Sequence, residues 1–291
     1  MKTMKIQEKL LLKIRMSEKV MSLTLMYITN NREIAKIADK TGVDRIFIDL
    51  ETIGKEERQH NMDTVKSKHI IEDIGNIKPY LKNAEVLVRV NKIHPNSREE
   101  IEQVIDQGAD IVMLPYFKSI QEIETFLSIV AGRTKVNLLL ETPEAVQILD
   151  EILQLENIDE IHIGLNDLHL GYHRKFMFEL LADGTVEEIC SKIKRKKIKY
   201  GFGGIAAIGK GLLPAEYIIC EHYRLGSELA ILSRTFCNTS KISDLEEIHR
   251  AFKQEMTKIR TYEAEVEEHW KYFKKNQQDI IRIVENIVGD R

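Results

Sequence analysis

Residues 136–146 read VNLLLETPEAV. The first five have the apolar character of a buried strand, Glu141 follows at once, and Thr142 with Pro143 opens a helix. Threonine is a frequent helix cap, and proline fits the first helical position. A carboxylate at the end of a buried strand needs a reason, since acids are rarely buried without a partner. The stretch predicts a strand, a helix and an acid between them.

Similar strand-to-helix units repeat along most of the chain. Runs that suit strands lie at residues 22–28, 44–50, 85–90, 110–114, 136–140, 159–163, 199–203 and 228–232. Helical patterns lie between them, for example at 98–107 and 120–130, and Ser97 ahead of Glu100 is typical of a helix cap. Eight such units predict a parallel α/β fold that closes into a (β/α)8 TIM barrel. A doubly wound open sheet is the alternative.

The chain divides into three segments. We expect a helical N-terminal segment at residues 1–19, the barrel at 20–240 and a helical extension at 241–291. In the extension, apolar residues recur at every seventh position: Leu245, Phe252, Ile259, Val266, Phe273, Ile280 and Ile287. This heptad predicts a helix packed along one seam. Unbroken, it would be about 65 Å long at ~1.5 Å per residue. It therefore either folds back as a hairpin on its own barrel or contacts another subunit, and we expect a homo-oligomer through these helices.

Composition excludes several classes of partner. The 43 Lys and Arg residues nearly balance the 46 Asp and Glu residues, which argues against nucleic-acid binding. The cysteines, Cys190, Cys220 and Cys237, form no CxxC pair, so a disulfide framework or a zinc knuckle is not expected. No apolar run reaches the roughly 20 residues of a membrane span, and the N-terminus lacks the apolar core of a signal peptide. We expect a cytoplasmic protein without a membrane partner.

The barrel prediction brings several polar residues to one mouth, because the C-terminal ends of barrel strands surround the site of chemistry. These residues are Asp49, Glu51, Arg89, Asn91, Glu141, Gly164, Asn166 and Asp167. Glu141 and Asp167, with room for water and a substrate oxygen, suit Mg²⁺ or Mn²⁺. As alternatives, each acid could be solvated or could cap the next helix. Arg89 interrupts an apolar run and needs an anionic partner if buried, and Asp49 could be that partner.

Five motifs then resemble a known family. IDLET, VLVRVN, GADIVMLP, LLLETPEA and IHIGLNDL occur in this order within residues 20–236 and are similar to the HpcH/HpaI aldolase/citrate lyase family. The resemblance implies a (β/α)8 barrel that binds Mg²⁺ or Mn²⁺ with pyruvate, oxaloacetate or a related 2-oxo acid. It implies a lyase or aldolase that makes or breaks a carbon–carbon bond through a metal-bound enolate.

The resemblance also implies roles for single residues. Glu141 and Asp167 would bind the metal, and Arg89 would bind substrate oxygens and stabilise the enolate. The backbone of Gly164, Leu165 and Asn166 would hold the substrate carboxylate. Physical chemistry agrees, since a divalent metal and an arginine stabilise negative charge that develops on an oxygen.

The chain departs from the aldolase branch at two positions. Thr52 stands where that branch has a histidine for acid–base chemistry, and Leu139 stands where it has a glutamine. The sequence therefore leaves the identity of the general base open. His60, His69 and a metal-bound water are candidates, and His169 is a candidate beside the metal ligands. We assign the catalytic role to Arg89, Glu51, Asp49 and His69.

Two alternatives to a 2-oxo acid lyase stay open. The first is an enzyme for phosphoenolpyruvate or a phosphonate, with Arg234 and the glycine-rich residues 201–211 binding phosphate; Arg234 could equally bind the carboxylate of a second substrate. The second is a barrel without catalysis that serves as a binding or assembly subunit. Residues 201–206, GFGGIA, also resemble a dinucleotide fingerprint with Glu221 as its acid, but a turn after the seventh strand is favoured.

Overall fold

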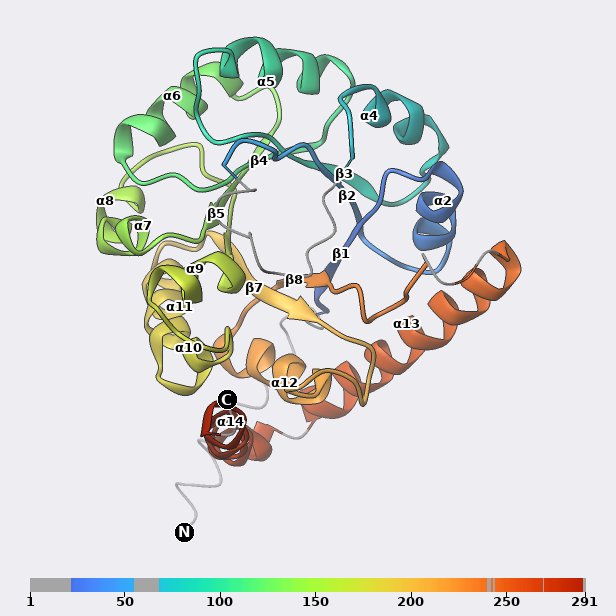
Figure 1. Ribbon diagram of the computed structural model, residues 1–291, viewed down its shortest axis with the longest axis vertical. Helices are drawn as coiled ribbons and strands as arrows, with labels where there is room; N and C mark the ends of the chain where they lie inside the picture. Colours follow the sequence, from blue (N-terminus) through green and yellow to red (C-terminus); the bar gives the residue numbers. More distant parts are fainter. Residues whose placement is uncertain (1–21, 55–67, 240–241, 243, 269, 290–291) are drawn as a thin grey trace, which may run out of the picture.

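Eight parallel strands form a closed barrel in the order β1 to β8 (Figure 1). The structure is a computed structural model that describes residues 22–54, 68–239, 242, 244–268 and 270–289. The strands are β1 (Thr24–Ile28), β2 (Arg45–Asp49), β3 (Glu85–Arg89), β4 (Ile111–Leu114), β5 (Lys135–Leu140), β6 (Glu160–Ile163), β7 (Lys199–Ile205) and β8 (Leu229–Leu232). The predicted TIM barrel is confirmed, and the doubly wound sheet is wrong. The predicted segment 1–19 and His60 lie outside the described residues.

Helices surround the barrel between its strands (Figure 1). They are α2 (Arg32–Lys40), α4 (Glu72–Ile77), the 3-10 helix η1 (Lys78–Tyr80), α5 (Ser97–Asp106), α6 (Ile120–Val130), α7 (Pro143–Gln147), α8 (Leu149–Ile152), α9 (Leu165–Gly171), α10 (Glu179–Ala182), α11 (Thr185–Arg195) and α12 (Ala215–Leu225). Thr142 caps α7 as predicted, because its hydroxyl accepts the N–H of Ala145 at 3.2 Å. Ser97 is not a cap: Asn96 precedes the helix, and the Ser97 hydroxyl accepts the N–H of His94 at 2.8 Å.

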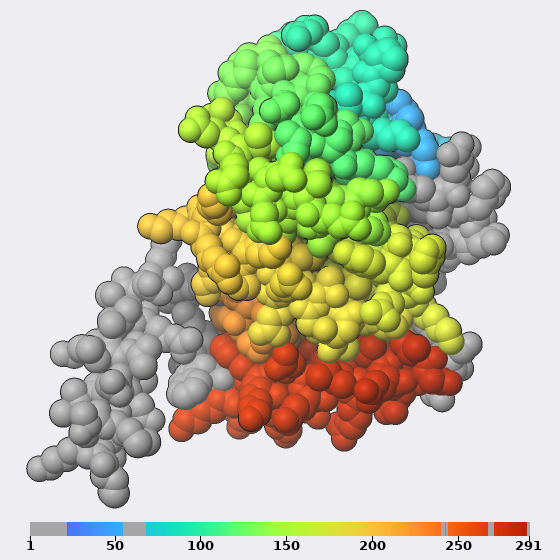
Figure 2. All heavy atoms as spheres, turned by 90° about the vertical axis from the view of Figure 1, so that its left-hand side faces the viewer, coloured from blue at the N-terminus to red at the C-terminus, as the bar shows by residue number. Residues whose placement is uncertain are grey.

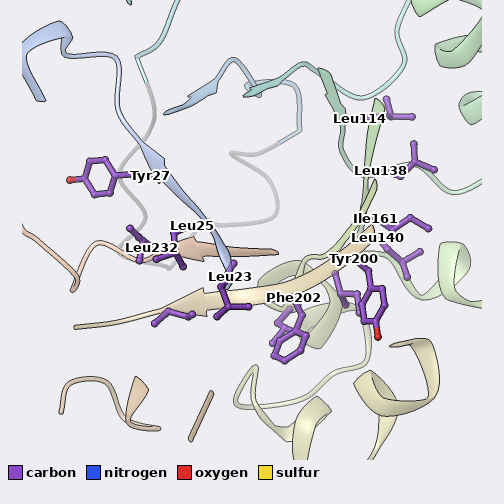
Figure 3. Packing of buried hydrophobic residues seen from close by; sticks show 14 of the residues in the cluster. Leu23, Leu25, Tyr27, Leu114, Leu138, Leu140, Ile161, Tyr200, Phe202 and Leu232 are labelled. Carbon is purple, nitrogen blue, oxygen red and sulfur yellow. The ribbon is translucent and has the colours of Figure 1, made fainter. Parts of the chain in front are cut away.

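Strand side chains alternate between the two faces of the barrel wall, as the pleat requires. The outward set packs against the helices and includes Leu25, Tyr27, Leu114, Leu138, Leu140, Ile161, Tyr200, Phe202 and Leu232 (Figure 3). A separate cluster fills the barrel: Met26, Phe47, Leu87, Ile111, Met113, Leu139 and Leu229. The wall is therefore buried on both sides, as its almost continuous apolar runs suggested.

An ionic layer closes the N-terminal end of the barrel. Arg45 of β2 donates two hydrogen bonds, at 2.7 and 2.6 Å, to Glu160 of β6. These strands are not neighbours, so the pair crosses the interior. Glu85 of β3 accepts the third Arg45 donor at 3.1 Å, and Asn137 of β5 donates to Glu160 at 3.0 Å. The sequence did not predict this layer.

The C-terminal extension folds back on the barrel as two helices, α13 (Leu245–Glu268) and α14 (Phe273–Gly289), with the 3-10 helix η2 (Trp270–Tyr272) before α14. α13 packs on α2 and α12, and α14 packs on α10 and α12. On the face shown in Figure 2 the extension, in red, lies below the later part of the barrel, in yellow. Phe252, Ile259 and Ile280 of the heptad are buried in this contact. The extension thus lies on its own barrel, with α13 and α14 each packed on barrel helices, and a subunit contact stays a prediction. None of the described helices has the length and apolarity needed to cross a membrane.

Two histidines are buried in the neutral form. His222 of α12 stacks on Phe202 with ring centroids 3.8 Å apart, and its Nδ1 pairs with the hydroxyl of Ser227 at 2.7 Å. His162 of β6 is equally buried. Burial lowers the pKa of His162 to about 4 and that of His222 to about 3.

We predict that Arg45→Met lowers the free energy of unfolding by about 3 kcal/mol, because it leaves the buried Glu160 carboxylate without its main partner. The double variant Arg45→Met/Glu160→Leu should recover most of this loss, since it removes both charges. Arg98→Met, which breaks the exposed pair with Glu102, is the control and should cost less than about 0.5 kcal/mol. Urea unfolding measures all three, and equal losses for the two single variants would contradict the assignment.

We also predict that stability falls as the pH drops from about 6.5 to about 4. The unfolded histidines bind protons below about 6.5 while the folded ones do not, so the unfolded state gains protons first. Each histidine removes at most about 1.4 kcal/mol per pH unit. His222→Phe, which keeps a ring against Phe202, should flatten this dependence in urea titrations between pH 4 and 7. A variant curve parallel to that of the wild type would refute the prediction.

Candidate active site

The strand order places the predicted polar residues around the C-terminal mouth of the barrel. Asp49 and Arg89 are the last residues of β2 and β3, and their positions are paired in the sheet register. Glu141 directly follows β5, and Asp167 lies in the first turn of α9 after β6. Parallel strands of a closed barrel all end at the same rim, so residues far apart in the chain share one mouth.

Arg89 is held by two acids, Asp49 at the end of β2 and Glu51 in the loop after it. Its Nε and Nη2 donate to the two carboxylate oxygens of Asp49, both at 2.9 Å, and its Nη1 lies 3.4 Å from Glu51 Oε2. Burial disfavours the charged guanidinium, but Asp49 and Glu51 outweigh it and raise the pKa of Arg89 well above its usual value. A guanidinium has five N–H donors, so about two remain for another oxygen. Asp49 is thus the partner that a buried arginine requires.

Glu141 and Asp167 line one pocket of about 520 Å³. Both are nearly buried, with 4% and 8% of their surface exposed. Glu141 Oε1 accepts the backbone N–H of Tyr116 at 3.0 Å. A Cβ on Gly164 would lie 2.7 Å from Glu141 Cβ and 2.8 Å from its Oε2. The glycine therefore allows the acid that follows β5 to lie directly against the backbone that follows β6.

The donor set fits a hard divalent cation. Four carboxylates at this mouth, those of Asp49, Glu51, Glu141 and Asp167, are buried. Asp49 and Glu51 contact Arg89, which leaves Glu141 and Asp167 as the oxygen donors on the pocket wall. Among the described residues, no three or more Asp, Glu, His or Cys side chains come together as a group that could hold a metal ion by itself. A cation here would take its other ligands from water and substrate, as Mg²⁺ commonly does.

Two of the candidate histidines, His69 and His169, lie within the described residues, and their contacts differ. His69 Nδ1 accepts the backbone N–H of Asp49 at 2.9 Å, so its second nitrogen carries the proton when the ring is neutral. His169 is buried in α9 with Nδ1 3.1 Å from the carbonyl of Leu165, which makes Nδ1 a donor. Neither contact reaches Glu141 or Asp167.

Other predicted binding residues are more scattered. Leu165 is buried, Asn166 is exposed on α9, and Arg234 lies in an exposed turn after β8. Residues 201–204 lie inside β7, where a Cβ on Gly201 would come within 2.0 Å of the Leu229 carbonyl oxygen. These glycines permit close strand packing. The dinucleotide fingerprint and the turn proposed for them are both wrong.

The side chain of Asn91 anchors the loop after β2, and the sequence did not predict this contact. Asn91 Oδ1 accepts the backbone N–H groups of Thr52 and Ile53 at 2.8 and 2.9 Å. Its amide nitrogen donates to Glu100 at 2.8 Å, and Glu100 also pairs with His94 at 2.8 Å. Asn91 was noted at the end of its strand, but the partners on the neighbouring loop depend on the fold.

Tyr116 and Lys118 also line the pocket and were not predicted. Both lie in the loop after β4, a strand that ends without an acid. The available signal was their position, since every loop that follows a barrel strand borders the mouth.

The chain matches the family model described as HpcH/HpaI aldolase/citrate lyase over residues 23–200. A search of curated protein sequences found no match. The matched region spans β1 to the start of β7 and includes Asp49, Arg89, Glu141 and Asp167.

Solved structures with the same fold include three informative ones. An HpcH/HpaI aldolase from Desulfitobacterium hafniense DCB-2 is 16% identical, with a TM-score of 0.56 over 73% of this chain and 86% of its own. An HpcH/HpaI aldolase/citrate lyase family protein from Burkholderia cenocepacia J2315 is 14% identical, with a TM-score of 0.55 over 86% and 98%. Macrophomate synthase is 12% identical, with a TM-score of 0.53 over 74% and 78%. At these identities the likeness shows the fold alone.

We predict that Gly164→Ala displaces the Glu141 side chain, because the new Cβ would overlap its Cβ and Oε2. Mn²⁺ affinity, measured by electron paramagnetic resonance, should fall at least about tenfold, the usual cost of disturbing a ligand's support. Gly289→Ala is the matched control, since a Cβ there meets nothing within 4 Å and its backbone is helical. Unchanged Mn²⁺ affinity in Gly164→Ala would show that Glu141 does not depend on this contact.

Proposed function

The chain belongs to the HpcH/HpaI aldolase/citrate lyase family, and we propose that it is a divalent-metal-dependent carbon–carbon lyase or aldolase acting on pyruvate or an oxaloacetate-like 2-oxo acid. One observation carries the proposal: Glu141 and Asp167 line a common pocket at the mouth where Asp49 holds Arg89 by two hydrogen bonds. This combination suits a reaction in which negative charge develops on a substrate oxygen.

Glu141 and Asp167 would hold the cation, which we propose to be Mg²⁺ or Mn²⁺. When bound, it would act as a Lewis acid on the 2-oxo group. Asp167 is well placed for this task because α9 begins directly after β6, so its first turn faces the mouth. The buried position of both acids keeps competing water away from their oxygens.

Arg89 would stabilise the enolate oxygen. Asp49 holds two of its nitrogens from one side, so the guanidinium plane is fixed before the substrate arrives. Donors that are oriented in advance stabilise developing charge without reorganisation. The substrate carboxylate would lie at the start of α9, where the N–H groups of Leu165 and Asn166 have no partner within the helix.

We assign proton transfer to Glu51. Both oxygens of Asp49 accept from Arg89, and Glu141 and Asp167 are assigned to the cation. Among the described residues that we place at the mouth, Glu51 is the remaining buried carboxylate, and its contact with Arg89 is longer, at 3.4 Å. His69 would act on the site through Asp49, whose backbone N–H its Nδ1 accepts.

The pocket beside Glu141 and Asp167 would take the second reactant. It extends from these acids toward α7 and α9 and is lined by both polar and apolar side chains. Its remaining lining is Tyr116, Lys118, Thr142, Pro143, Glu144, Gln147, Leu170 and Gly171. A volume of about 520 Å³ lies within the range of small-molecule sites.

We predict that Glu141→Ala and Asp167→Ala each abolish Mn²⁺ binding and metal-dependent exchange of the pyruvate methyl protons with D₂O. Exchange reports enolate formation without any second substrate. Glu144→Ala is the matched control, because Glu144 lines the same pocket but its side chain is 48% exposed and pairs with Lys118. Its Mn²⁺ affinity and exchange rate should stay within about twofold of the wild type.

Electron paramagnetic resonance of Mn²⁺ and proton NMR of pyruvate measure the two quantities. Far-ultraviolet circular dichroism should show an intact fold in all three variants. Mn²⁺ affinity that is unchanged in both Glu141→Ala and Asp167→Ala would remove the metal site and with it the proposed reaction.

A further inference from the structure

Tyr116 has a backbone conformation that its side chain disfavours. Its φ is +49°, in the left-handed region where bulky residues are rare. Other described non-glycine residues with positive φ are Ala131, Asn157, His173 and Lys197. Ala131 caps α6, and His173 and Lys197 come directly after the caps of α9 and α11, where left-handed residues commonly end a helix. Tyr116 follows a strand, so helix termination does not explain its conformation.

The unusual conformation has a visible consequence at Glu141. It accompanies a hydrogen bond from the Tyr116 backbone N–H to Glu141 Oε1 at 3.0 Å. A hydrogen bond to a carboxylate is charge-assisted and stronger than one between neutral groups. It occupies one oxygen, while Oε2 is the oxygen that lies beside Gly164. The two oxygens of Glu141 therefore have different surroundings.

The Tyr116 ring is also held in place. The ammonium groups of Lys118 and Lys92 lie 5.4 and 5.9 Å from its centroid, within the range of cation–π contacts. Pro115 precedes it and restricts the backbone on that side. A strained residue persists when its surroundings fix it, and such residues cluster at functional sites.

We propose that Tyr116 is a positioning residue for the metal ligand Glu141. Its left-handed backbone directs the N–H group to Oε1 and so fixes the orientation of the Glu141 carboxylate that would bind the cation. The ring, held by Lys92 and Lys118, keeps the turn in this conformation. This inference rests on the proposed metal site and adds a residue that contributes no side-chain atom to it.

The first test removes only the donor. Incorporating the α-hydroxy acid analogue of tyrosine at position 116 replaces the N–H by an ester oxygen and keeps the ring. The Mn²⁺ dissociation constant, measured by electron paramagnetic resonance, should rise about tenfold, as for other groups that orient metal ligands. The Mn²⁺ spectrum should change as well, because the orientation of the Glu141 carboxylate would no longer be fixed by this hydrogen bond.

Side-chain variants provide a second test that does not depend on the ester. Tyr116→Phe keeps the ring and the N–H, so Mn²⁺ affinity should be retained. Tyr116→Gly tolerates the positive φ but loses the lysine contacts, and its affinity should fall about fivefold or more. Ala131→Gly is the matched control: it relaxes a similar φ of 50° at the end of α6 and should leave Mn²⁺ affinity unchanged.

A metal-free readout examines the hydrogen bond itself. In protein labelled with ¹⁵N-tyrosine, the Tyr116 amide proton should resonate downfield and should move upfield in Glu141→Gln, because a neutral amide is a weaker acceptor. An amide resonance that does not respond to Glu141→Gln would overturn the inference.

The outcomes separate this inference from the proposed function. Wild-type Mn²⁺ binding with equal affinity in the ester and Tyr116→Gly proteins would overturn the role of Tyr116 and leave the metal site standing. No Mn²⁺ binding by the wild type would overturn the proposed function and this inference together. Weaker binding in both proteins, with Tyr116→Phe and Ala131→Gly unchanged, would support it.

Discussion

The paired hydrogen bonds between Arg89 and Asp49 are the constraint on which the mouth of the barrel depends. A guanidinium at the end of a buried strand must be neutralised, and Asp49 at the same level of β2 does this with both oxygens. The pairing fixes the plane of Arg89 and points its remaining donors away from β2. Glu141 and Asp167 lie on the wall of a pocket at the same mouth, and two carboxylates that share one pocket are oxygen donors of the kind that a hard divalent cation prefers.

Because strand side chains alternate between the two faces, β2 and β3 each carry charged residues at both ends of the barrel interior. On β2 the inward positions are Arg45, Phe47 and Asp49, so one strand carries a charge at each end and an apolar residue between them. On β3 the order is reversed, with the acid Glu85 at the start of the strand and Arg89 at its end. The apolar middle separates an ionic layer that closes the barrel from an ionic layer at the open mouth. In the layer at the N-terminal end, Arg45 of β2 donates two hydrogen bonds to Glu160 of β6. These bonds restrain the distance between two strands on opposite sides of the barrel.

The sequence predicted what local patterns encode. Apolar runs located all eight strands to within two residues, and Glu141 and Asp167 were found because they interrupt strand-to-helix units. Contacts that depend on register or on a single φ angle were missed. The Tyr116 turn, the Asn91 anchor and the Arg45 layer each join residues from different strands or loops, and no spacing in the chain reveals them. The same limitation explains the wrong interpretation of residues 201–206, in which Gly201 lies against the backbone of β8.

The departures from the aldolase branch fit this arrangement. Thr52, which replaces a histidine, contributes its backbone N–H to Asn91, so the loop after β2 is fastened by main-chain contacts. Leu139, which replaces a glutamine, is buried below Gly164 and adds apolar surface under the proposed metal ligands. The first change removes an imidazole and the second a polar amide, and both keep the carboxylates of the mouth. Because that position has no histidine, we propose Glu51 for acid–base chemistry, and such a base works best where a neighbouring arginine and a cation lower the pKa of the substrate group that it must deprotonate.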